Sequence, residues 1–380
     1  MDYTVQPLRL KVAKAARYVR LYGVKRTLMK ISGQQHMKKD YLSLPAIAKP
    51  LATGGRVGLI GCGNFGFSTV AYYLEKIEPG CLRGAMDIDI NKAASVFERF
   101  KLKYYTTDAE EIITDPEIKL IYVASNHASH AEYAIRCINA GKHVHIEKPH
   151  VVDAGQLERL MAAMQAKPEV KVFLGFNRPR SPLFKSLTEV LAAETGPTMI
   201  NWFIAGHAIE PGHWYFDAKE GGRVLGNLCH WTDLTLQLVG QDAAFPCTIM
   251  SSTPVDSASD FVVSVIFADQ SCAAITFSAK GHTFEGVREV LNLHKGNLLA
   301  NLTDFQKLSI DIGSRRHRRT LRYREHGHEA NIHRSFFGLQ PVIAGESQNY
   351  LKATAVFFLM IKKAIDTGER VTISRQDVQP

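Results

Sequence analysis

The stretch "GLIGCGNFGFS" at residues 58–68 limits the possible folds of this chain more than any other feature. It spaces Gly61, Gly63 and Gly66 as G-x-G-x-x-G, directly after an apolar run that we predict to be a strand (56–61) and before a predicted helix (65–77). In that context the first glycine allows a tight turn, the second allows close approach to phosphate, and the third allows close helix–strand packing. The N–H groups at the start of the helix then face the phosphates. The stretch therefore predicts a dinucleotide-binding turn.

The identity of the dinucleotide follows from the end of the next predicted strand. Asp87 lies there, about 20 residues beyond Gly66, where an acidic residue accepts hydrogen bonds from the adenosine ribose. Ile88 and Asp89 follow, and no Lys or Arg occurs before Lys92. A 2′-phosphate would meet carboxylates, so the sequence favours NAD over NADP.

Short apolar strands alternate with helices through the first half of the chain. After the strand at 56–61 and the helix at 65–77, we expect strands at 82–88, 120–125, 143–148 and 170–177, and helices at 90–100, 128–140 and 154–166. This alternation is typical of an α/β fold with a doubly wound parallel sheet, the Rossmann arrangement.

The pattern changes near residue 195. Strand-like segments with few helices between them follow at 199–206, 247–253, 261–268, 272–279 and 287–302, with a helix at 347–366. They predict a C-terminal α+β domain with a large, open, mostly antiparallel sheet. We place the domains at 1–53 (basic helical extension and linker), 54–178 (dinucleotide-binding) and 179–380 (substrate binding and oligomerisation, with the C-terminal helix).

The positive charge is concentrated at the N-terminus. Residues 1–40 hold ten Lys or Arg and two Asp, a charge of +8, whereas the remaining 36 basic and 35 acidic residues nearly cancel. The body of the protein therefore lacks the overall basicity of a nucleic-acid-binding domain. Residues 8–31 have helical apolar periodicity, with a kink or stop at Gly23. We expect the apolar stripe to pack on the main body or a partner subunit; the alternative is contact with an anionic membrane.

Cysteine spacing and hydropathy indicate a cytoplasmic protein. The six cysteines form no C-x-x-C pair, which argues against a disulfide framework or zinc knuckle and predicts buried free thiols. The N-terminus lacks an apolar signal-peptide core, and the longest apolar run, residues 353–361, is shorter than the roughly 20 residues that a bilayer span needs.

With the glycine turn in place, residues 121–149 resemble the Gfo/Idh/MocA family of NAD(P)-dependent oxidoreductases. The resemblance rests on Glu147-Lys148-Pro149 after a strand, His130-Ala131 at the start of the preceding helix and Ala140-Gly141-Lys142 at its end. "GFNRPRSP" (175–182) and "GGRVLGNLCHWTDL" (221–234) add to it. The family joins a Rossmann domain to an α/β domain with a large open sheet and acts mostly on sugars, sugar derivatives and nucleotide sugars.

The resemblance implies two catalytic residues, Lys148 and His230. Lys148 follows a strand at the edge of the sheet where ligands bind, and the family's lysine there contacts the substrate hydroxyl. An imidazole has a pKa suited to proton removal, which makes His230 the candidate base. The expected cofactor-binding residues are Gly61, Gly63, Asn64, Phe65, Gly66, Asp87, Ser125, Asn126, His130, Glu147 and Lys148.

The sequence departs from the common family pattern beside His230. Many members carry Asp four residues before this His, where this chain has Gly226, and a polar residue, Asn227, comes one place later. On a helix Asn227 and His230 would be neighbours, and Asp233 would be able to orient the ring. The expected substrate-binding residues are Asn177, Arg178, His213, Trp214, Arg223 and Asn227, of which arginine suits phosphate or carboxylate and tryptophan suits a sugar face.

No metal site is expected. His127 and His130 belong to the cofactor-side turn, and His143 and His145 alternate within a strand, so they point to opposite faces.

These features predict an NAD-dependent oxidoreductase that acts on a secondary alcohol or ketone of a sugar or nucleotide sugar. Its motifs resemble those of enzymes of polysaccharide or lipopolysaccharide biosynthesis. We also expect a homo-oligomer, either a dimer or a tetramer. Two alternatives stay open: a ketone or imine reductase on a non-sugar metabolite, and a cofactor-binding scaffold that works through its basic N-terminal helix at a membrane or assembly.

Overall fold

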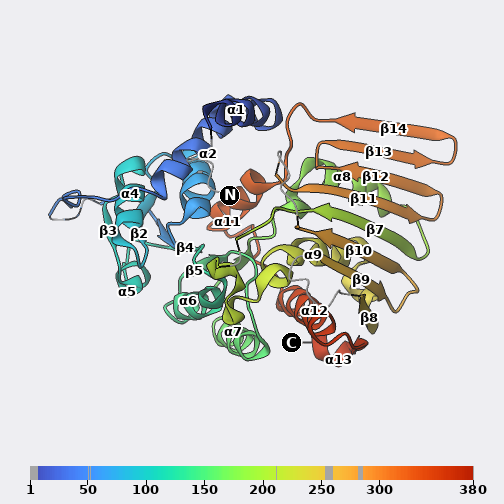
Figure 1. Cartoon of the computed structure of the whole chain (residues 1–380). Coiled ribbons are helices and arrows are strands. Elements are labelled where there is room, and N and C mark those ends of the chain that lie inside the picture. Colours follow the sequence, from blue (N-terminus) through green and yellow to red (C-terminus); the bar gives the residue numbers. More distant parts are fainter. Residues whose placement is uncertain are drawn as a thin grey trace. The chain divides into compact units, whose positions relative to one another are not determined.

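The computed structural model describes residues 7–49, 51, 53–210, 212–252, 260–280 and 286–379, which form two compact units (Figure 1). Unit 2 comprises residues 25–175 and 329–348, and unit 1 comprises residues 1–24, 176–328 and 349–380. The sequence predicted a change of domain at 178, close to the change of unit after Gly175. Residues 25–49, expected in the extension, and 329–348, expected in the C-terminal domain, instead lie with unit 2. Residues 50 and 52 of the predicted linker and 253 of a predicted strand are outside the described residues.

Unit 2 is built on a parallel sheet, as predicted, with six strands where the sequence predicted five. Its order is β3-β2-β1-β4-β5-β6, the order of a dinucleotide-binding Rossmann fold. The strands are β1 (Val57–Ile60), β2 (Leu82–Met86), β3 (Tyr104–Thr106), β4 (Leu120–Val123), β5 (His143–Ile146) and β6 (Val172–Leu174). The strands are almost wholly buried, as expected for a parallel sheet covered on both faces, and β1 and β4 are continuous apolar runs.

The helices of this unit include the four predicted at 65–77, 90–100, 128–140 and 154–166, whereas the helix at 328–337 was not predicted. They are α2 (Val24–His36), α3 (Tyr72–Ile77), α4 (Ile90–Phe100), α5 (Ala109–Ile113), α6 (His127–Asn139), α7 (Ala154–Ala166) and α11 (His328–Phe337). The predicted helix at 65–77 differs in one respect, because η1 (Gly66–Ala71) is π-helical. The short elements β3 and α5 were not predicted, since three- to five-residue elements carry little periodicity.

Unit 1 carries a nine-stranded sheet that is mostly antiparallel, which confirms the predicted fold class. Its order is β14-β13-β12-β11-β7-β10-β9-β8-β15, and only β7 and β10 run parallel. The strands are β7 (Thr198–Ala205), β8 (Cys247–Ser252), β9 (Asp260–Ile266), β10 (Cys272–Ser278), β11 (Arg288–Lys295), β12 (Leu298–Thr303), β13 (Lys307–Ile312), β14 (Arg315–Thr320) and β15 (Val371–Ile373). Strands such as β7 and β9 alternate buried and exposed residues, so one face of the sheet is covered and the other is open.

Helices cover one face of this sheet, with α8 against β12 and β13 and α9 against β7 (Figure 1). The helices of the unit are α1 (Leu8–Tyr22), α8 (Pro182–Leu191), α9 (Cys229–Val239), α10 (Gln241–Ala244), α12 (Gln348–Thr367) and α13 (Arg375–Val378). Single turns form η2 (Arg178–Arg180), η3 (Trp214–Phe216) and η4 (Ala218–Glu220), and η5 (Val224–Leu228) is π-helical.

The edge strand β14 corrects the expectation that basicity is confined to the N-terminus. Its sequence is "RRHRRT" and every residue is exposed. Charged side chains on an open edge oppose pairing with another strand. A local basic strip therefore exists although the body as a whole is nearly neutral.

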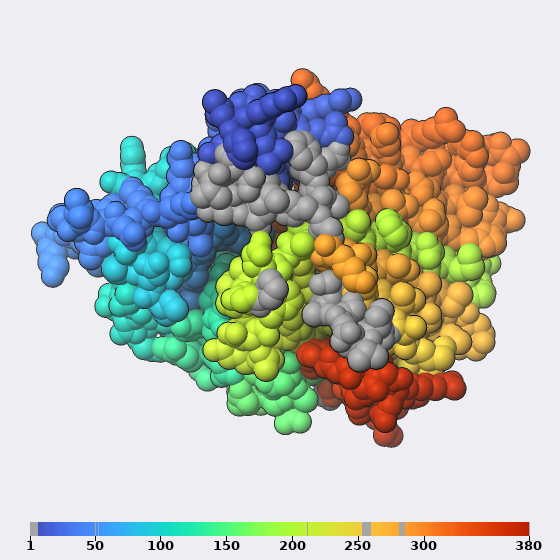
Figure 2. Space-filling model, in the orientation of Figure 1, coloured from blue at the N-terminus to red at the C-terminus, as the bar shows by residue number. Residues whose placement is uncertain are grey.

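The N-terminal extension packs differently from the prediction. Gly23, with φ of 82°, separates α1 from α2 as expected. The apolar residues Val24, Leu28 and Ile31 are 58%, 60% and 43% exposed, so they do not pack on the body of this chain, and packing on a partner subunit stays a prediction for them. The buried positions of α2 are Thr27, Met29, Gly33 and His36. In Figure 2 helix α1, in dark blue, lies on the molecular surface.

Two further properties bear on the sequence analysis. Five of the six cysteines are buried and Cys272 is exposed, and all six are free thiols, as predicted. Within the described ranges, no helix has both the length and the apolar character that crossing a membrane requires.

Candidate functional site

The glycine turn of unit 2 has the shape that a dinucleotide pyrophosphate needs. Gly61 has a φ of 94°, and a Cβ there would lie 2.5 Å from the backbone of Ala124. A Cβ on Gly66 would overlap the Gly61 carbonyl oxygen, so the helix can approach the strand only with glycine there. A Cβ on Gly63 would meet nothing within 4 Å. The first and third glycines thus fit the protein itself, and the open space at Gly63 fits a phosphate.

Asp87 is held where a ribose can reach it. One carboxylate oxygen accepts from the Cys62 N–H at 2.7 Å and the other from the Asp89 N–H at 2.9 Å. A carboxylate has about four acceptor positions, so both oxygens retain capacity for ribose hydroxyls. The turn and the ribose contact are therefore linked through Cys62.

His130 connects two loops at the carboxyl edge of the sheet. Its Nδ1 lies 2.8 Å from the Pro149 carbonyl and its Nε2 lies 3.1 Å from the Ser125 carbonyl. Burial lowers the pKa of His130, although both carbonyls favour the protonated ring. A neutral ring donates to only one carbonyl at a time. His130 therefore ties the loop after β4 to the Lys148-Pro149 turn after β5.

Glu147 is anchored from behind by a buried polar chain. Its Oε1 lies 3.3 Å from His145 Nε2, and His145 Nδ1 lies 2.9 Å from Ser335 Oγ. The Tyr122 hydroxyl joins the same serine at 3.0 Å. Gly175 leaves room for the glutamate, because a Cβ there would lie 2.6 Å from Glu147 Oε2. The half-buried Lys148 thus extends from a fixed turn.

The other expected cofactor residues surround the same edge. The Asn64 amide oxygen accepts from the Ser68 hydroxyl at 2.9 Å, and Phe65 packs on the hydrophobic core of the unit. Ser125 pairs with Ser129 at 2.6 Å, and Ser129 also donates to Asn126, the N-cap of α6. Unit 2 therefore brings all the predicted cofactor residues to the ends of β1, β2, β4 and β5.

In unit 1, His230 stands at the start of α9, directly after the π-helical turn η5. Its ring is half-buried, edge-on to Phe176 and Trp231 at centroid distances of 6.2 and 6.0 Å. In the described part of the chain, π-helix occurs in two places, after the glycine turn and before His230. Such π-turns are rare and concentrate at functional sites.

Arg223 and Asn227 contact each other across this π-turn. Arg223 Nη1 donates to the Asn227 amide oxygen at 3.2 Å, and Nη2 donates to the His207 carbonyl. Arg223 is buried, and burial lowers the pKa of its guanidinium. No carboxylate of the described residues pairs with Arg223. By contrast the three other buried arginines, Arg83, Arg178 and Arg324, each bind a carboxylate.

Asp233, expected to orient the His230 ring, is fully buried and contacts helix α12. Its carboxylate accepts hydrogen bonds from the Tyr350 hydroxyl, from Gln237 at 3.0 Å and from Thr354 at 3.4 Å. These contacts fasten α9 to α12. Asp233 therefore serves the packing of two helices.

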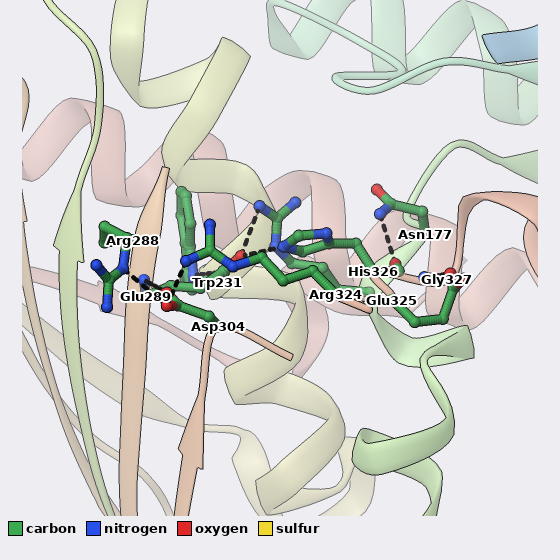
Figure 3. A network of polar contacts seen from close by, with 10 residues as sticks. Asn177, Trp231, Arg288, Glu289, Asp304, Arg324, Glu325, His326 and Gly327 are labelled. Atoms are coloured by element: carbon green, nitrogen blue, oxygen red, sulfur yellow. Dashed lines mark hydrogen bonds and ion pairs between the residues drawn. The ribbon is translucent and has the colours of Figure 1, made fainter. Parts of the chain in front are cut away.

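Asn177 and Arg178, expected at the substrate, belong to a buried polar network. Figure 3 shows Asn177, Trp231 and Glu289 within it. Arg178 donates to Glu289 at 2.9 and 3.1 Å, and Trp231 Nε1 donates to the same carboxylate at 2.8 Å. Although burial alone would raise it, Arg178 and His326 lower the pKa of Glu289 to about 2. Asn177 donates to the His326 carbonyl at 2.6 Å. The network holds Trp231, the residue next to His230, in place.

His213 and Trp214 lie on an exposed turn. His213 caps η3, accepting from the Tyr215 N–H at 3.3 Å, and its ring lies 5.5 Å from that of Trp214. Partial burial lowers the pKa of His213. Trp214 is 43% exposed, which leaves ring surface accessible. Within the described residues, no group of three metal-ligating side chains is found.

Sequence reasoning missed His36, His145 and Glu289. His36 comes from the extension, His145 was noted only as one member of a strand pair, and Glu289 pairs with a residue 111 positions away. The available signals were weak: a histidine in an apolar strand and a glutamate opening a strand-like run.

Comparison with known proteins identifies the Rossmann part. Residues 55–176 match the GFO_IDH_MocA family, described as an oxidoreductase family with an NAD-binding Rossmann fold. This family therefore describes residues 55–176 of the chain. The resemblance noted in the sequence is confirmed, and the cofactor is NAD.

Sequence relatives match the same part. Oxidoreductase P35 of Formosa agariphila is 34% identical over 35% of this chain and 41% of its own. Myo-inositol 2-dehydrogenase of Thermotoga maritima is 32% identical over 37% of this chain and 41% of its own. The match thus spans less than half the length of these curated relatives.

Solved structures match over both units. GenD2 from gentamicin A biosynthesis, in complex with NAD, has a TM-score of 0.71 at 18% identity, covering 87% of this chain and 99% of that one. Levoglucosan dehydrogenase in complex with NADH has a TM-score of 0.70 at 20% identity, covering 84% and 99%. At this identity the likeness shows the fold.

Proposed function

We propose that this protein is an NAD-dependent dehydrogenase or reductase acting on a secondary alcohol or ketone of a sugar or nucleotide sugar. The order of polar groups along one sheet edge carries the proposal. Asp87 follows β2, the glycine turn follows β1 and Lys148 follows β5. In the order β2-β1-β4-β5, Asp87 and Lys148 stand on opposite sides of the turn. Asp87 would bind the adenosine ribose, and the glycine turn would bind the pyrophosphate. Lys148 would lie beside the nicotinamide.

The chemistry assigns a role to each side chain. Nicotinamide, when bound, accepts or donates a hydride at C4. The Lys148 ammonium donates a hydrogen bond to the reacting oxygen and stabilises negative charge on it. His230 takes the hydroxyl proton in oxidation and returns it in reduction. His130 and the Glu147–His145 chain keep the Lys148 turn in one position.

Three observations support a sugar-type substrate. Relatives carry the names myo-inositol 2-dehydrogenase and levoglucosan dehydrogenase. Trp214 offers an exposed aromatic ring, the kind of surface that packs on a sugar face. Arg223 is a buried cation beside Asn227, and a buried charge without a protein counter-ion is costly unless a ligand neutralises it. Arg223 thus favours a substrate with a phosphate or carboxylate, as in a nucleotide sugar.

The proposed setting is polysaccharide or lipopolysaccharide biosynthesis in the cytoplasm, by a homo-oligomer. Exposed apolar residues on the open face of the nine-stranded sheet, Met199, Phe203, Val262, Ile266 and Leu299, supply an oligomerisation surface. The exposed apolar side chains within the segment 8–31 supply a second surface, for a partner or a membrane.

The test is a panel of free sugars, sugar acids and nucleotide sugars with NAD⁺, and of keto-sugars with NADH, followed by absorbance of the reduced nicotinamide. We expect turnover with at least one anionic sugar, and for Arg223→Gln a rise in KM for that substrate larger than for a neutral analogue. Binding of NADH with no turnover across the panel would refute the sugar assignment.

A further inference from the structure

Helix α2 lies outside the part of the chain that matches the family, yet it is built into the Rossmann unit. Met29 belongs to the same buried core cluster as Leu59 and Phe67, next to the glycine turn. The face of α2 that packs on the unit carries mostly polar or small residues, and Thr27, Gly33 and His36 are buried there. A helix held only by hydrophobic burial would turn its apolar stripe inward. The inward polar residues therefore call for specific partners.

His36 contacts the glycine turn itself. Its Nε2 lies 2.6 Å from the carbonyl oxygen of Cys62, its Nδ1 lies 2.9 Å from Ser95 Oγ, and its ring stacks on Phe67 at 4.1 Å. A carbonyl only accepts, so Nε2 carries the hydrogen and the serine hydroxyl donates to Nδ1. Burial lowers the pKa of His36, which favours this neutral form.

This contact fixes the direction of one backbone group in the turn. In a trans peptide the C=O and the following N–H point in opposite directions. By holding the Cys62 carbonyl, His36 therefore turns the Gly63 N–H away from itself. The Cys62 N–H is held at the same time by Asp87, at 2.7 Å. His36 and the ribose-binding carboxylate thus fix the two sides of a single residue in the turn.

Two other α2 residues contact the helix that follows the turn. A Cβ on Gly33 would lie 2.8 Å from Asn64 Oδ1 and 3.1 Å from Ser68 Cβ, so only glycine lets α2 approach this closely. Arg26 donates to the Ser68 carbonyl and, at 2.9 Å, to Thr69 Oγ1, within the π-helical turn η1. These contacts brace the first two turns of the phosphate-binding helix, which begins at Asn64.

We propose that α2 is a working part of the dinucleotide site and that His36 is a positioning residue for it. His36 acts through the Cys62 carbonyl, and Gly33 and Arg26 hold the start of the phosphate-binding helix. This role concerns dinucleotide affinity alone and is independent of the substrate proposed above.

The test compares two variants of the full chain by NADH fluorescence titration. The Gln amide nitrogen occupies the position of Nε2 and donates to the carbonyl, whereas Asn reaches only the position of Nδ1. We expect His36→Asn to raise the Kd for NADH about tenfold, the effect of one lost hydrogen bond, and His36→Gln to stay within about twofold of wild type. His333→Asn, the same change elsewhere in unit 2, should leave the Kd unchanged.

Equal NADH affinity in His36→Asn and wild type would overturn the proposal, as would equal losses in His36→Asn and His36→Gln. Circular dichroism establishes whether each variant folds. If His36→Asn does not fold, Gly33→Ala decides: alanine improves helix propensity but pushes against Asn64, so we expect weaker NADH binding by several-fold. Unchanged NADH binding in Gly33→Ala would then refute the role of α2.

Discussion

The two candidate sites of this chain are built from different groups. In the Rossmann unit the candidate groups for the dinucleotide are largely backbone: a glycine turn, a helix start and carbonyls that His130 and His36 contact. In the second unit the candidate groups are side chains, and most of them are held by other side chains, as Arg178 is by Glu289 and Asp233 by Tyr350. A backbone site depends on a few glycines and on packing, whereas a side-chain site depends on buried charge pairs.

The largest expected effect tests whether each unit contributes one reacting side chain. Lys148→Ala and His230→Ala should each lower kcat by about 10²–10⁴-fold, the usual contribution of a positioned acid or base. The Kd for NADH should change little, because neither residue forms the turn. The measurements are steady-state rates and NADH titration. Full activity in either variant would remove that residue from the mechanism.

The second prediction concerns the buried pair behind His230. Arg178→Met should lower the free energy of unfolding by about 3–5 kcal/mol, because it leaves Glu289 buried without its main counter-ion. Arg316→Met, which breaks an exposed pair with Asp311, should leave the free energy of unfolding close to that of wild type. Urea denaturation measures both. If Arg178→Met were as stable as wild type but bound substrate poorly, Arg178 would belong to the substrate site after all.

The third prediction separates two glycines of the turn. Gly66→Ala should destabilise unit 2 by about 1–3 kcal/mol, since its methyl group overlaps the Gly61 carbonyl. Gly63→Ala should keep the stability of wild type, since its methyl group meets open space, and still bind NADH poorly. Thermal unfolding and NADH titration together distinguish them. Tight NADH binding by Gly63→Ala would show that the pyrophosphate does not lie at Gly63.

The smallest effect is a pH dependence from the two histidines that hold backbone carbonyls. Burial lowers the pKa of both His36 and His130 below 6.5 in the folded protein. At a pH below about 6.5 the unfolded state therefore binds more protons than the folded state. The contribution of the two histidines to the free energy of unfolding is complete above about pH 6.5 and is lost as the pH falls toward the folded pKa values. Each histidine changes stability by at most about 1.4 kcal/mol per pH unit. Urea titrations at pH 7.5, 6.5 and 5.5 should show this slope, and His36→Gln should reduce it.

Local patterns in the sequence predict the parts of the fold that rest on local rules. Helix α7 lies at 154–166 as expected, because its apolar repeat and its Asp153 N-cap agree. The glycine turn was predictable because its shape depends on backbone sterics. The exposed strand β14 was not, since a run of arginines has no apolar alternation.

What the sequence could not predict depends on partners far apart in the chain. Nothing near Arg178 shows that it will pair with Glu289, and nothing near His36 shows that it will meet Cys62. Extension helix α2 was expected to pack through Leu28 and Ile31, but the polar contacts of Arg26 and His36 and the close approach at Gly33 determine its orientation. The π-turns were likewise hidden, because a π-helix differs from an α-helix by a single inserted residue.

Gly23 has a consequence for the connectivity of the molecule. The chain passes from one unit to the other between residues 24 and 25, and again at 175/176, 328/329 and 348/349. The first of these passages exists because of the extension, and Gly23, in a conformation that favours glycine, stands beside it. Any hinge motion between the units must therefore change the backbone torsion angles in four connecting segments at once. The extension thus adds a covalent restraint on such motion, and a protease cut at Gly23 would remove it while leaving α2 on its own unit.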